Sequence, residues 1–218
     1  MLKQMKEDEK QGSSQHPLRL AGMHSIYSGI EGKLLYRWQR IRQMTLKPIA
    51  AALNWIGITP DMLSLASVAL GIGFLVGART NLALALILLA ISVLLDGLDG
   101  VLARYTRNVS ARGSFTDMFC DQLVTACTVG GLVWANIVMG VLGVLFVYIY
   151  TALVTFLMLH EVLAVSSSWL IRPSRMLLYA FLVIYYFTGR NWLNDLLIAY
   201  LGATPLLLLS FTRLRRAL

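Results

Sequence analysis

The stretch Leu82 to Arg104, LALALILLAISVLLDGLDGVLAR, is a long apolar run that ends in two aspartates, Asp96 and Asp99, each followed by glycine. About 20 apolar residues are enough to cross the ~30 Å hydrocarbon core of a membrane as a helix. An ionisable residue inside such a segment is costly and marks a functional site by default. The stretch therefore predicts a transmembrane helix that carries a polar site at one end.

The composition of the whole chain agrees with a membrane protein. Of its 218 residues 57% are hydrophobic and 14% are charged, and the mean hydropathy is +0.67. An ordinary soluble domain has about 25% charged residues. The net charge of +8 is what the cationic inner loops of a membrane protein produce, so it does not indicate nucleic-acid binding. The sequence predicts an all-α integral membrane protein that binds no nucleic acid.

Three kinds of sequence follow one another along the chain. Residues 1–30 are polar, lack apolar periodicity and are expected to form a disordered tail. In residues 33–57 apolar side chains recur at helical spacing next to lysines and arginines, which predicts an amphipathic helix on the cytoplasmic surface of the membrane. Residues 59–214 begin with a helix-start signal, threonine then proline, and divide into six apolar runs at about 61–78, 82–104, 114–138, 140–166, 174–188 and 192–212. The predicted fold is six transmembrane helices preceded by an interfacial helix.

The distribution of cations predicts how these helices are oriented. With six spans and the tail inside, 17 of the 19 Lys and Arg residues lie on the inner side, and the outer loops hold Arg79 and Arg190. Cytoplasmic loops are enriched in Lys and Arg. We therefore predict a multi-pass protein of the inner (cytoplasmic) membrane with both termini in the cytoplasm. Asp96 and Asp99 then lie at the cytoplasmic end of their helix.

Two further aspartates, Asp117 and Asp121, follow on the next predicted helix, so that four lie within 26 residues. Asp96 and Asp99 are three residues apart, and Asp117 and Asp121 are four apart, so each pair shares one helix face. The short connection folds the second helix back beside the first, which lets the four carboxylates converge. Because one carboxylate at mid-bilayer costs roughly 2.5–3.5 kcal/mol, four would cost on the order of 10 kcal/mol. A positive charge must therefore lie among them.

The residues around the aspartates indicate which cation this is. Nearby arginines could pair with the carboxylates, but they do not account for the small residues. Glycine costs roughly 0.5–1 kcal/mol in a helix relative to alanine, unless something must approach the backbone closely. Hard oxygens in this number suit Mg²⁺ or Mn²⁺, which bind through carboxylates and substrate phosphates. The residues predict a divalent-metal site beside a phosphate-bearing ligand, with Arg104 available to the phosphate and room made by Gly97, Gly100, Ala103 and Gly113.

The spacing of these residues resembles the signature of the CDP-alcohol phosphotransferase family. Every motif position and both spacings match in the pattern Asp96-x-x-Asp99-Gly100-x-x-Ala103-Arg104, eight residues, Gly113-x-x-x-Asp117-x-x-x-Asp121. The resemblance implies six transmembrane helices and a cytoplasmic amphipathic helix over about residues 33–212, and a homodimer. It also implies a metal-dependent transferase of phospholipid synthesis.

The resemblance further implies a role for each motif residue. Asp96, Asp99 and Asp117 would hold one or two Mg²⁺ or Mn²⁺ ions against the pyrophosphate of a CDP-linked donor. Asp121 would contribute to the metal site and act as the catalytic base that takes the proton of the acceptor hydroxyl. That hydroxyl would attack the β-phosphate, and CMP would leave. Contacts to the donor would come from Asp99, Gly100, Ala103, Arg104 and Gly113. Asp61, where many relatives have asparagine after Thr-Pro, is a further candidate contact to the nucleotide, although an acidic residue in a first turn also suits the helix dipole.

The substrates are less closely specified by the sequence. The donor is expected to be the lipid CDP-diacylglycerol, because a site near the inner surface can receive a lipid laterally and a polar acceptor from the cytosol. The acceptor is expected to be a small polar alcohol, a polyol or polyol phosphate such as inositol phosphate or glycerol phosphate. Its candidate contacts are Arg112, His160, Glu161, Arg172 and Arg175.

These acceptor contacts have alternatives. Arg172-Pro-Ser-Arg175 resembles the Arg-x-x-Arg element of inositol-phosphate-using members, but loop arginines also follow from the positive-inside rule. Those members carry a Lys-Ala-Arg-Ala-Glu-like stretch late in the fourth span, where this chain reads FLMLHE at residues 156–161. His160 and Glu161 therefore either line the acceptor pocket or serve the structure alone.

Other functions are compatible with parts of the pattern. The motif also permits transfer of a head group from a soluble CDP-alcohol to a lipid acceptor. Intramembrane prenyltransferases use aspartate-rich helices with Mg²⁺ and pyrophosphate, but they have about nine spans and two motifs far apart in sequence. A cation transporter would need polar groups along several spans, and the first, fifth and sixth runs have almost none. Metal-dependent release of CMP from CDP-diacylglycerol distinguishes these readings.

Overall fold

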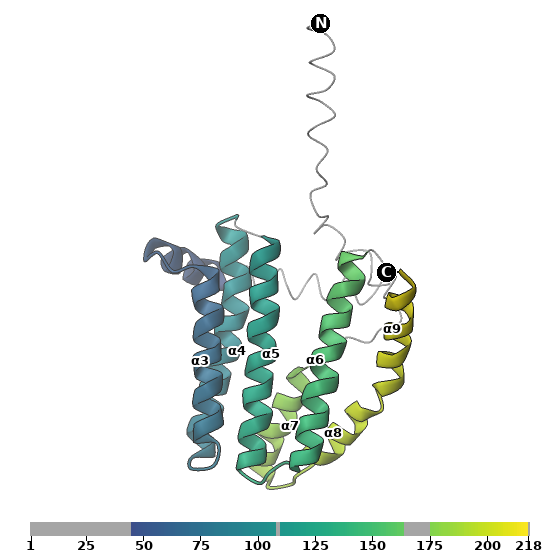
Figure 1. Cartoon of the computed structure of the whole chain (residues 1–218). Coiled ribbons are helices and arrows are strands. Elements are labelled where there is room, and N and C mark those ends of the chain that lie inside the picture. The colour runs from purple at the N-terminus through teal and green to yellow at the C-terminus, as the bar shows by residue number, and fades with distance from the viewer. Residues whose placement is uncertain (1–44, 108–109, 164–174, 218) are drawn as a thin grey trace, which may run out of the picture. The chain divides into compact units, whose positions relative to one another are not determined.

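The computed structural model describes residues 45–107, 110–163 and 175–217, which all lie in the unit Arg40–Leu218. Within these ranges the chain forms helices joined by short turns, and it forms no strand (Figure 1). This confirms the all-α prediction for the described part of the chain. The predicted tail at residues 1–30, the first part of the predicted interfacial helix and Arg172 lie outside the described residues.

Each of the six predicted apolar runs contains a helix. Residues 45–55 are helical as well, inside the predicted amphipathic segment 33–57, whose position on the membrane surface stays a prediction. The helices that follow are α3 (Pro60–Gly77), α4 (Leu82–Tyr105), α5 (Ala111–Trp134), α6 (Gly140–Val162), α7 (Arg175–Thr188), α8 (Leu193–Leu201) and α9 (Thr204–Ala217).

Four segments of the described chain are long and apolar enough to cross a membrane. They are Pro60–Gly77, Leu82–Tyr105, Gly140–His160 and Leu193–Arg216. The other two predicted spans differ from these in length or polarity. Helix α7 has 14 residues, and the N-terminal half of α5 carries Arg112, Asp117 and Asp121. The prediction of six spans is therefore confirmed in part, and the orientation of the helices stays a prediction.

Polar caps fix where the first three of these helices begin. Thr59 accepts a hydrogen bond from the backbone N–H of Met62 at 3.3 Å, and proline follows it at the first helical position, as the sequence predicted. Asn81 caps α4 in the same way. Ser110 caps α5 by accepting from the N–H of Gly113 at 3.1 Å. This last cap starts α5 three residues earlier than the apolar pattern alone predicted.

The break between α5 and α6 also lies earlier than predicted. We predicted a helix over 114–138, but α5 ends at Trp134. Asn136 has a φ of 58°, the left-handed conformation that ends a helix and that Asn tolerates better than most residues. The asparagine was the signal for this end, and the glycines that follow it misled the prediction.

The predicted run 192–212 is one span with an interruption at residues 202–203, between α8 and α9. Pro205 has no N–H to donate to the carbonyl of Leu201, and its ring would clash with that carbonyl in a continuous helix. The hydroxyl of Thr204 donates to the Leu201 carbonyl instead, at 2.6 Å. A side chain thus satisfies the backbone group that proline leaves without a partner.

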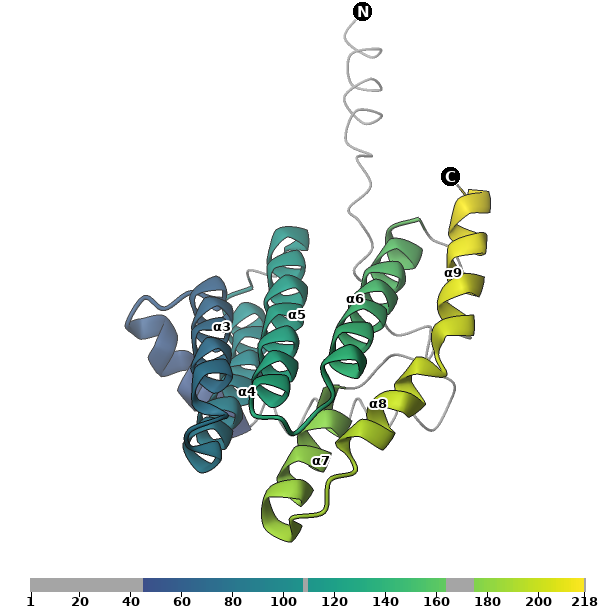
Figure 2. The ribbon, with the colours of Figure 1, turned by 60° about the horizontal axis from the view of Figure 1, so that its bottom comes forward.

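Helix α3 packs against both α4 and α5, and the three run side by side in both views (Figure 1, Figure 2). Their common core includes Phe74, Leu89 and Val124. Glycines bring the backbones of α3 and α5 together, because a Cβ built at Gly71 would lie 3.3 Å from the Cα of Val124. Small residues serve this purpose between membrane helices in general. This packing holds the ends of α4 and α5, which carry the aspartates, in one place.

The α3–α5 contact yields a stability prediction. A Cβ at Gly131 would lie 3.1 Å from the Cα of Leu75 and 3.0 Å from the ring of Phe74, whereas a Cβ at Gly130 would meet only the tip of the Leu75 side chain at 3.2 Å. Both alanine substitutions add the same helix propensity, but only Gly131→Ala pushes against backbone. We expect Gly131→Ala to be less stable than Gly130→Ala by about 1–3 kcal/mol. Thermal unfolding of the purified variants in detergent measures this, and equal melting temperatures would contradict it.

Candidate metal centre

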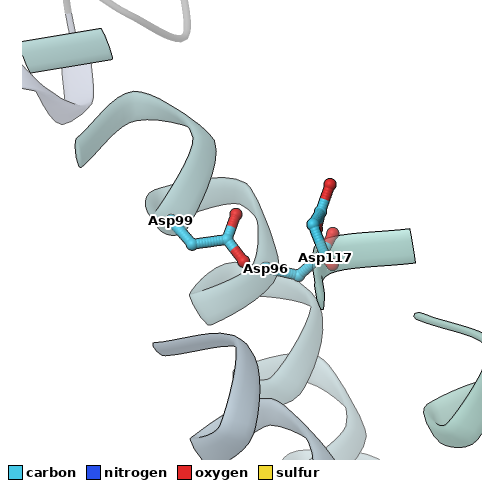
Figure 3. Close-up of side chains that lie close together, drawn as sticks. All are labelled: Asp96, Asp99 and Asp117. Atoms are coloured by element: carbon cyan, nitrogen blue, oxygen red, sulfur yellow. The ribbon is translucent and has the colours of Figure 1, made fainter. Parts of the chain in front are cut away.

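Three of the predicted aspartates lie together where α4 and α5 face each other (Figure 3). Asp96 and Asp99 are one turn apart on α4, and Asp117 comes from the second turn of α5. One oxygen from each of the three carboxylates lies within 4.8 Å of the others. Asp99 is buried, Asp96 is half-buried and Asp117 is exposed. The group is therefore anchored on α4 and open on the side of Asp117.

The chemistry of this group fits a divalent cation. Mg²⁺ takes oxygen ligands at about 2.0–2.1 Å, so two oxygens bound to one ion lie at most about 4 Å apart. The three carboxylate oxygens, at 4.8 Å or less, are close to that spacing. Mg²⁺ also keeps positions for water or phosphate, and the exposed side at Asp117 offers access for them. Asp96, Asp99 and Asp117 could thus hold Mg²⁺ or Mn²⁺, as predicted.

The fourth aspartate, Asp121, is held by an arginine from another helix. Arg175, the first residue of α7, donates from Nη2 to Asp96 at 2.5 Å and from Nη1 to Asp121. Its guanidinium is largely buried, with 10% of the side chain exposed. The arginine therefore ties α7 to α4 and α5 and neutralises part of the charge that the sequence placed there. The role of Asp121 as a further metal ligand stays a prediction.

A serine that the sequence analysis did not single out supports the buried aspartate. Ser64 on α3 donates a hydrogen bond to Oδ2 of Asp99 at 2.6 Å. Two more serines lie nearby: Ser67 donates to the Ser64 carbonyl within α3 at 2.7 Å, and Ser92 of α4 donates across to the Ser67 carbonyl at 2.9 Å. Serines in otherwise apolar spans were the available signal, since polar side chains in membrane helices usually bond across to a neighbour.

The predicted donor contacts lie on or near the C-terminal end of α4. A Cβ built at Gly100 would lie 3.5 Å from Nη2 of Arg104, so the arginine side chain folds back over the glycine. Asp61 is exposed in the first turn of α3. That end of α3 packs on the end of α4, with Leu63 against Leu102 in one buried cluster. Gly113 lies in the first turn of α5, after the short connection, and Ala103 is half-buried on α4.

The predicted acceptor contacts do not all gather at this site. Arg175 does, through its pairs with the aspartates. Arg112 is exposed in the first turn of α5. His160 is fully buried, and its Nε2 lies 2.9 Å from the hydroxyl of Ser210, which joins α6 to α9. Glu161 belongs to α6, but its side chain lies outside the described residues. For His160 the structure thus shows a helix-packing contact, and its place in an acceptor pocket stays a prediction.

Comparisons with known proteins agree with the motif. A sequence model of the family described as CDP-alcohol phosphatidyltransferase matches residues 57–209. The archaetidylinositol phosphate synthase of Pyrococcus horikoshii is 37% identical over 100 residues, which are 43% of this chain and 50% of that protein. The chain thus spans about half the length of this curated relative. The region matched by the family includes all four aspartates and Arg175.

Proposed function

Because this chain belongs to the CDP-alcohol phosphatidyltransferase family, we propose that it transfers a phosphatidyl group from CDP-diacylglycerol to a hydroxyl of a polar alcohol and releases CMP. One observation carries the proposal: within the matched region, oxygens of Asp96, Asp99 and Asp117 come within 4.8 Å of one another at the ends of two apolar helices. Such a group suits a metal that binds a pyrophosphate. A lipid substrate would explain why this polar group lies in membrane helices.

The metal-binding residues in this proposal are Asp96, Asp99 and Asp117, with Asp121 beside them. A bound Mg²⁺ or Mn²⁺ would polarise the phosphate oxygens and offset the charge that develops on the departing CMP. Arg104, whose side chain folds over Gly100 at the exposed end of α4, would contact a donor phosphate. Because Gly100 has no side chain, the donor can lie close to the helix backbone there.

Asp121 is the base in this proposal. The acceptor oxygen forms a bond to the β-phosphorus, the bond from that phosphorus to the oxygen of CMP breaks, and the hydroxyl proton passes to the Asp121 carboxylate. Arg175 orients Asp121 through its ion pair and joins it to Asp96. The carboxylate is therefore held in place before the acceptor arrives, which is what a base needs to act within hydrogen-bond reach.

For the acceptor, we propose a polyol phosphate, with inositol phosphate first among them. The relative's name says that it makes archaetidylinositol phosphate. Arg175 lies at the aspartates, where a guanidinium can bind the phosphate of an anionic alcohol through two hydrogen bonds. The cytoplasmic orientation favours such a soluble acceptor, and both that orientation and a homodimer stay predictions.

The test is an acceptor screen with the full-length chain purified in detergent. The protein is given CDP-diacylglycerol with Mg²⁺ or Mn²⁺ and, separately, inositol phosphate, glycerol phosphate, inositol or no acceptor. CMP release and the lipid product are followed by mass spectrometry. We expect metal-dependent CMP release with one polyol phosphate and its loss in excess EDTA. No CMP release with any acceptor would contradict the proposal, and product formed only from a soluble CDP-alcohol and diacylglycerol would reverse the roles of donor and acceptor.

A further inference from the structure

The hydrogen bond between Ser64 and Asp99 joins two helices at the buried side of the metal centre. The two residues are 35 positions apart in sequence, and each is 4% exposed. Their oxygens are 2.6 Å apart, which is the range of a strong hydrogen bond from a hydroxyl to a carboxylate. Asp99 is also the most buried of the three candidate ligands. Water therefore has little access to orient this carboxylate, and the protein must do so.

The single hydroxyl proton of Ser64 has two acceptors within reach, and the Asp99 carboxylate is the better one. Its oxygen also lies 3.3 Å from the Pro60 carbonyl, the usual contact of a helical serine with its own backbone. The Asp99 carboxylate oxygen is 0.7 Å closer than the Pro60 carbonyl oxygen, so the proton belongs to the bond between the helices. In a span where most neighbours are apolar, this arrangement gives a buried carboxylate a hydroxyl donor from the neighbouring helix.

The backbone that carries Ser64 is itself fixed. Ser67 bonds to the Ser64 carbonyl at 2.7 Å, and Ser92 bonds from α4 to the Ser67 carbonyl at 2.9 Å. All of these serines are buried. The two helices are thus joined at two levels, one with an aspartate in the bond and one without. Ser92 therefore provides a control for packing that does not involve the metal centre.

We propose that Ser64 is a positioning residue of the metal centre, which holds Oδ2 of Asp99 so that the carboxylate is aligned with Asp96 and Asp117. The inference rests on the proposed function only in taking this group as a site for Mg²⁺ or Mn²⁺. The torsion at the end of an aspartate side chain is broad, so an aspartate without this bond would sample orientations that do not face its neighbours. Hydrogen-bond partners of metal ligands typically contribute 10–100-fold in metal affinity.

The test measures Mn²⁺ binding to the full-length protein in detergent, without substrates, by electron paramagnetic resonance of free Mn²⁺. We expect Ser64→Ala to weaken Mn²⁺ binding by about 10–100-fold, and Ser64→Thr, which keeps a hydroxyl, to restore most of it. Ser92→Ala removes an equally buried bond between α3 and α4 and should change the dissociation constant by less than about threefold. Thermal unfolding of each variant shows that the compared proteins are folded.

Two results would overturn the role of Ser64. One is wild-type Mn²⁺ affinity in a folded Ser64→Ala variant, and the other is an equal loss of affinity in Ser92→Ala, which would assign the effect to helix packing. The Mn²⁺-binding test can also succeed or fail independently of the proposed transferase function. Mn²⁺ binding that is weakened by Ser64→Ala, in a wild-type protein that releases no CMP from CDP-diacylglycerol, would support the positioning role and contradict the transferase proposal.

Discussion

The Asp121→Asn variant is expected to lose phosphatidyl transfer by about 10²–10⁴-fold, the usual contribution of a positioned base, while it still binds Mn²⁺ and CDP-diacylglycerol. An amide has nearly the shape of the carboxylate but cannot take the acceptor proton. The three carboxylates that lie within 4.8 Å of one another do not include Asp121. Its loss should therefore spare most of the metal affinity. Single-turnover transfer and Mn²⁺ titration of the same sample measure the two quantities.

A companion variant separates the base from the ligands. Asp117→Asn removes a member of the three-oxygen group, so it should weaken Mn²⁺ binding and lose transfer together. Asp195→Asn, in the exposed first turn of α8, is the matched control for charge and should keep both. Turnover at the wild-type rate in Asp121→Asn would remove Asp121 from the base role. Loss of Mn²⁺ binding in that variant, equal to the loss in Asp117→Asn, would make it a ligand instead.

Much of the fold follows from local signals in the sequence. The start of α3 was predicted from Thr59 and Pro60, because a capping hydroxyl and a fixed φ act on neighbouring residues. The same local reasoning could have found the caps at Asn81 and Ser110 and the left-handed Asn136. These errors moved helix ends by a few residues. They did not change which segments are helical, because the apolar runs between them decide that.

The candidate site was predictable only in part. Asp96 and Asp99 share a face because of the helical repeat alone, and the short connection to α5 brings Asp117 near them. The partners of these aspartates come from farther away: Ser64 is 35 residues from Asp99, and Arg175 is 54 residues from Asp121. Which face of α3 or α7 meets the cluster depends on how the helices rotate against each other. Packing decides that rotation, through contacts such as Gly71 against Val124, and no repeat in the sequence encodes it.

The Arg175→Ala variant is expected to show the second large effect, in stability as well as in activity. The substitution leaves Asp96 and Asp121 facing each other without the guanidinium that joins them. Removing one partner from a buried ion pair costs about 3–5 kcal/mol, and we expect the lower end because 20% and 29% of the two carboxylate side chains are exposed. A large drop in melting temperature should result. Arg79→Ala, which removes an exposed cation, should have little effect.

The same variant tests how Arg175 acts on the acceptor. If the guanidinium also binds the acceptor phosphate, Arg175→Ala should raise the KM for inositol phosphate far more than that for inositol, whereas equal effects would favour a purely structural cation. Arg175→Lys keeps the charge but loses the planar fork, so it should recover stability better than it recovers acceptor binding. A double-mutant cycle measures how much of the stability lost in Arg175→Ala comes from the ion pair to Asp121. Because Asp121→Asn removes one of the two facing charges, Arg175→Ala should destabilise that variant less than it destabilises the wild type. An equal loss of melting temperature in both backgrounds would show that the ion pair to Asp121 contributes nothing to the fold.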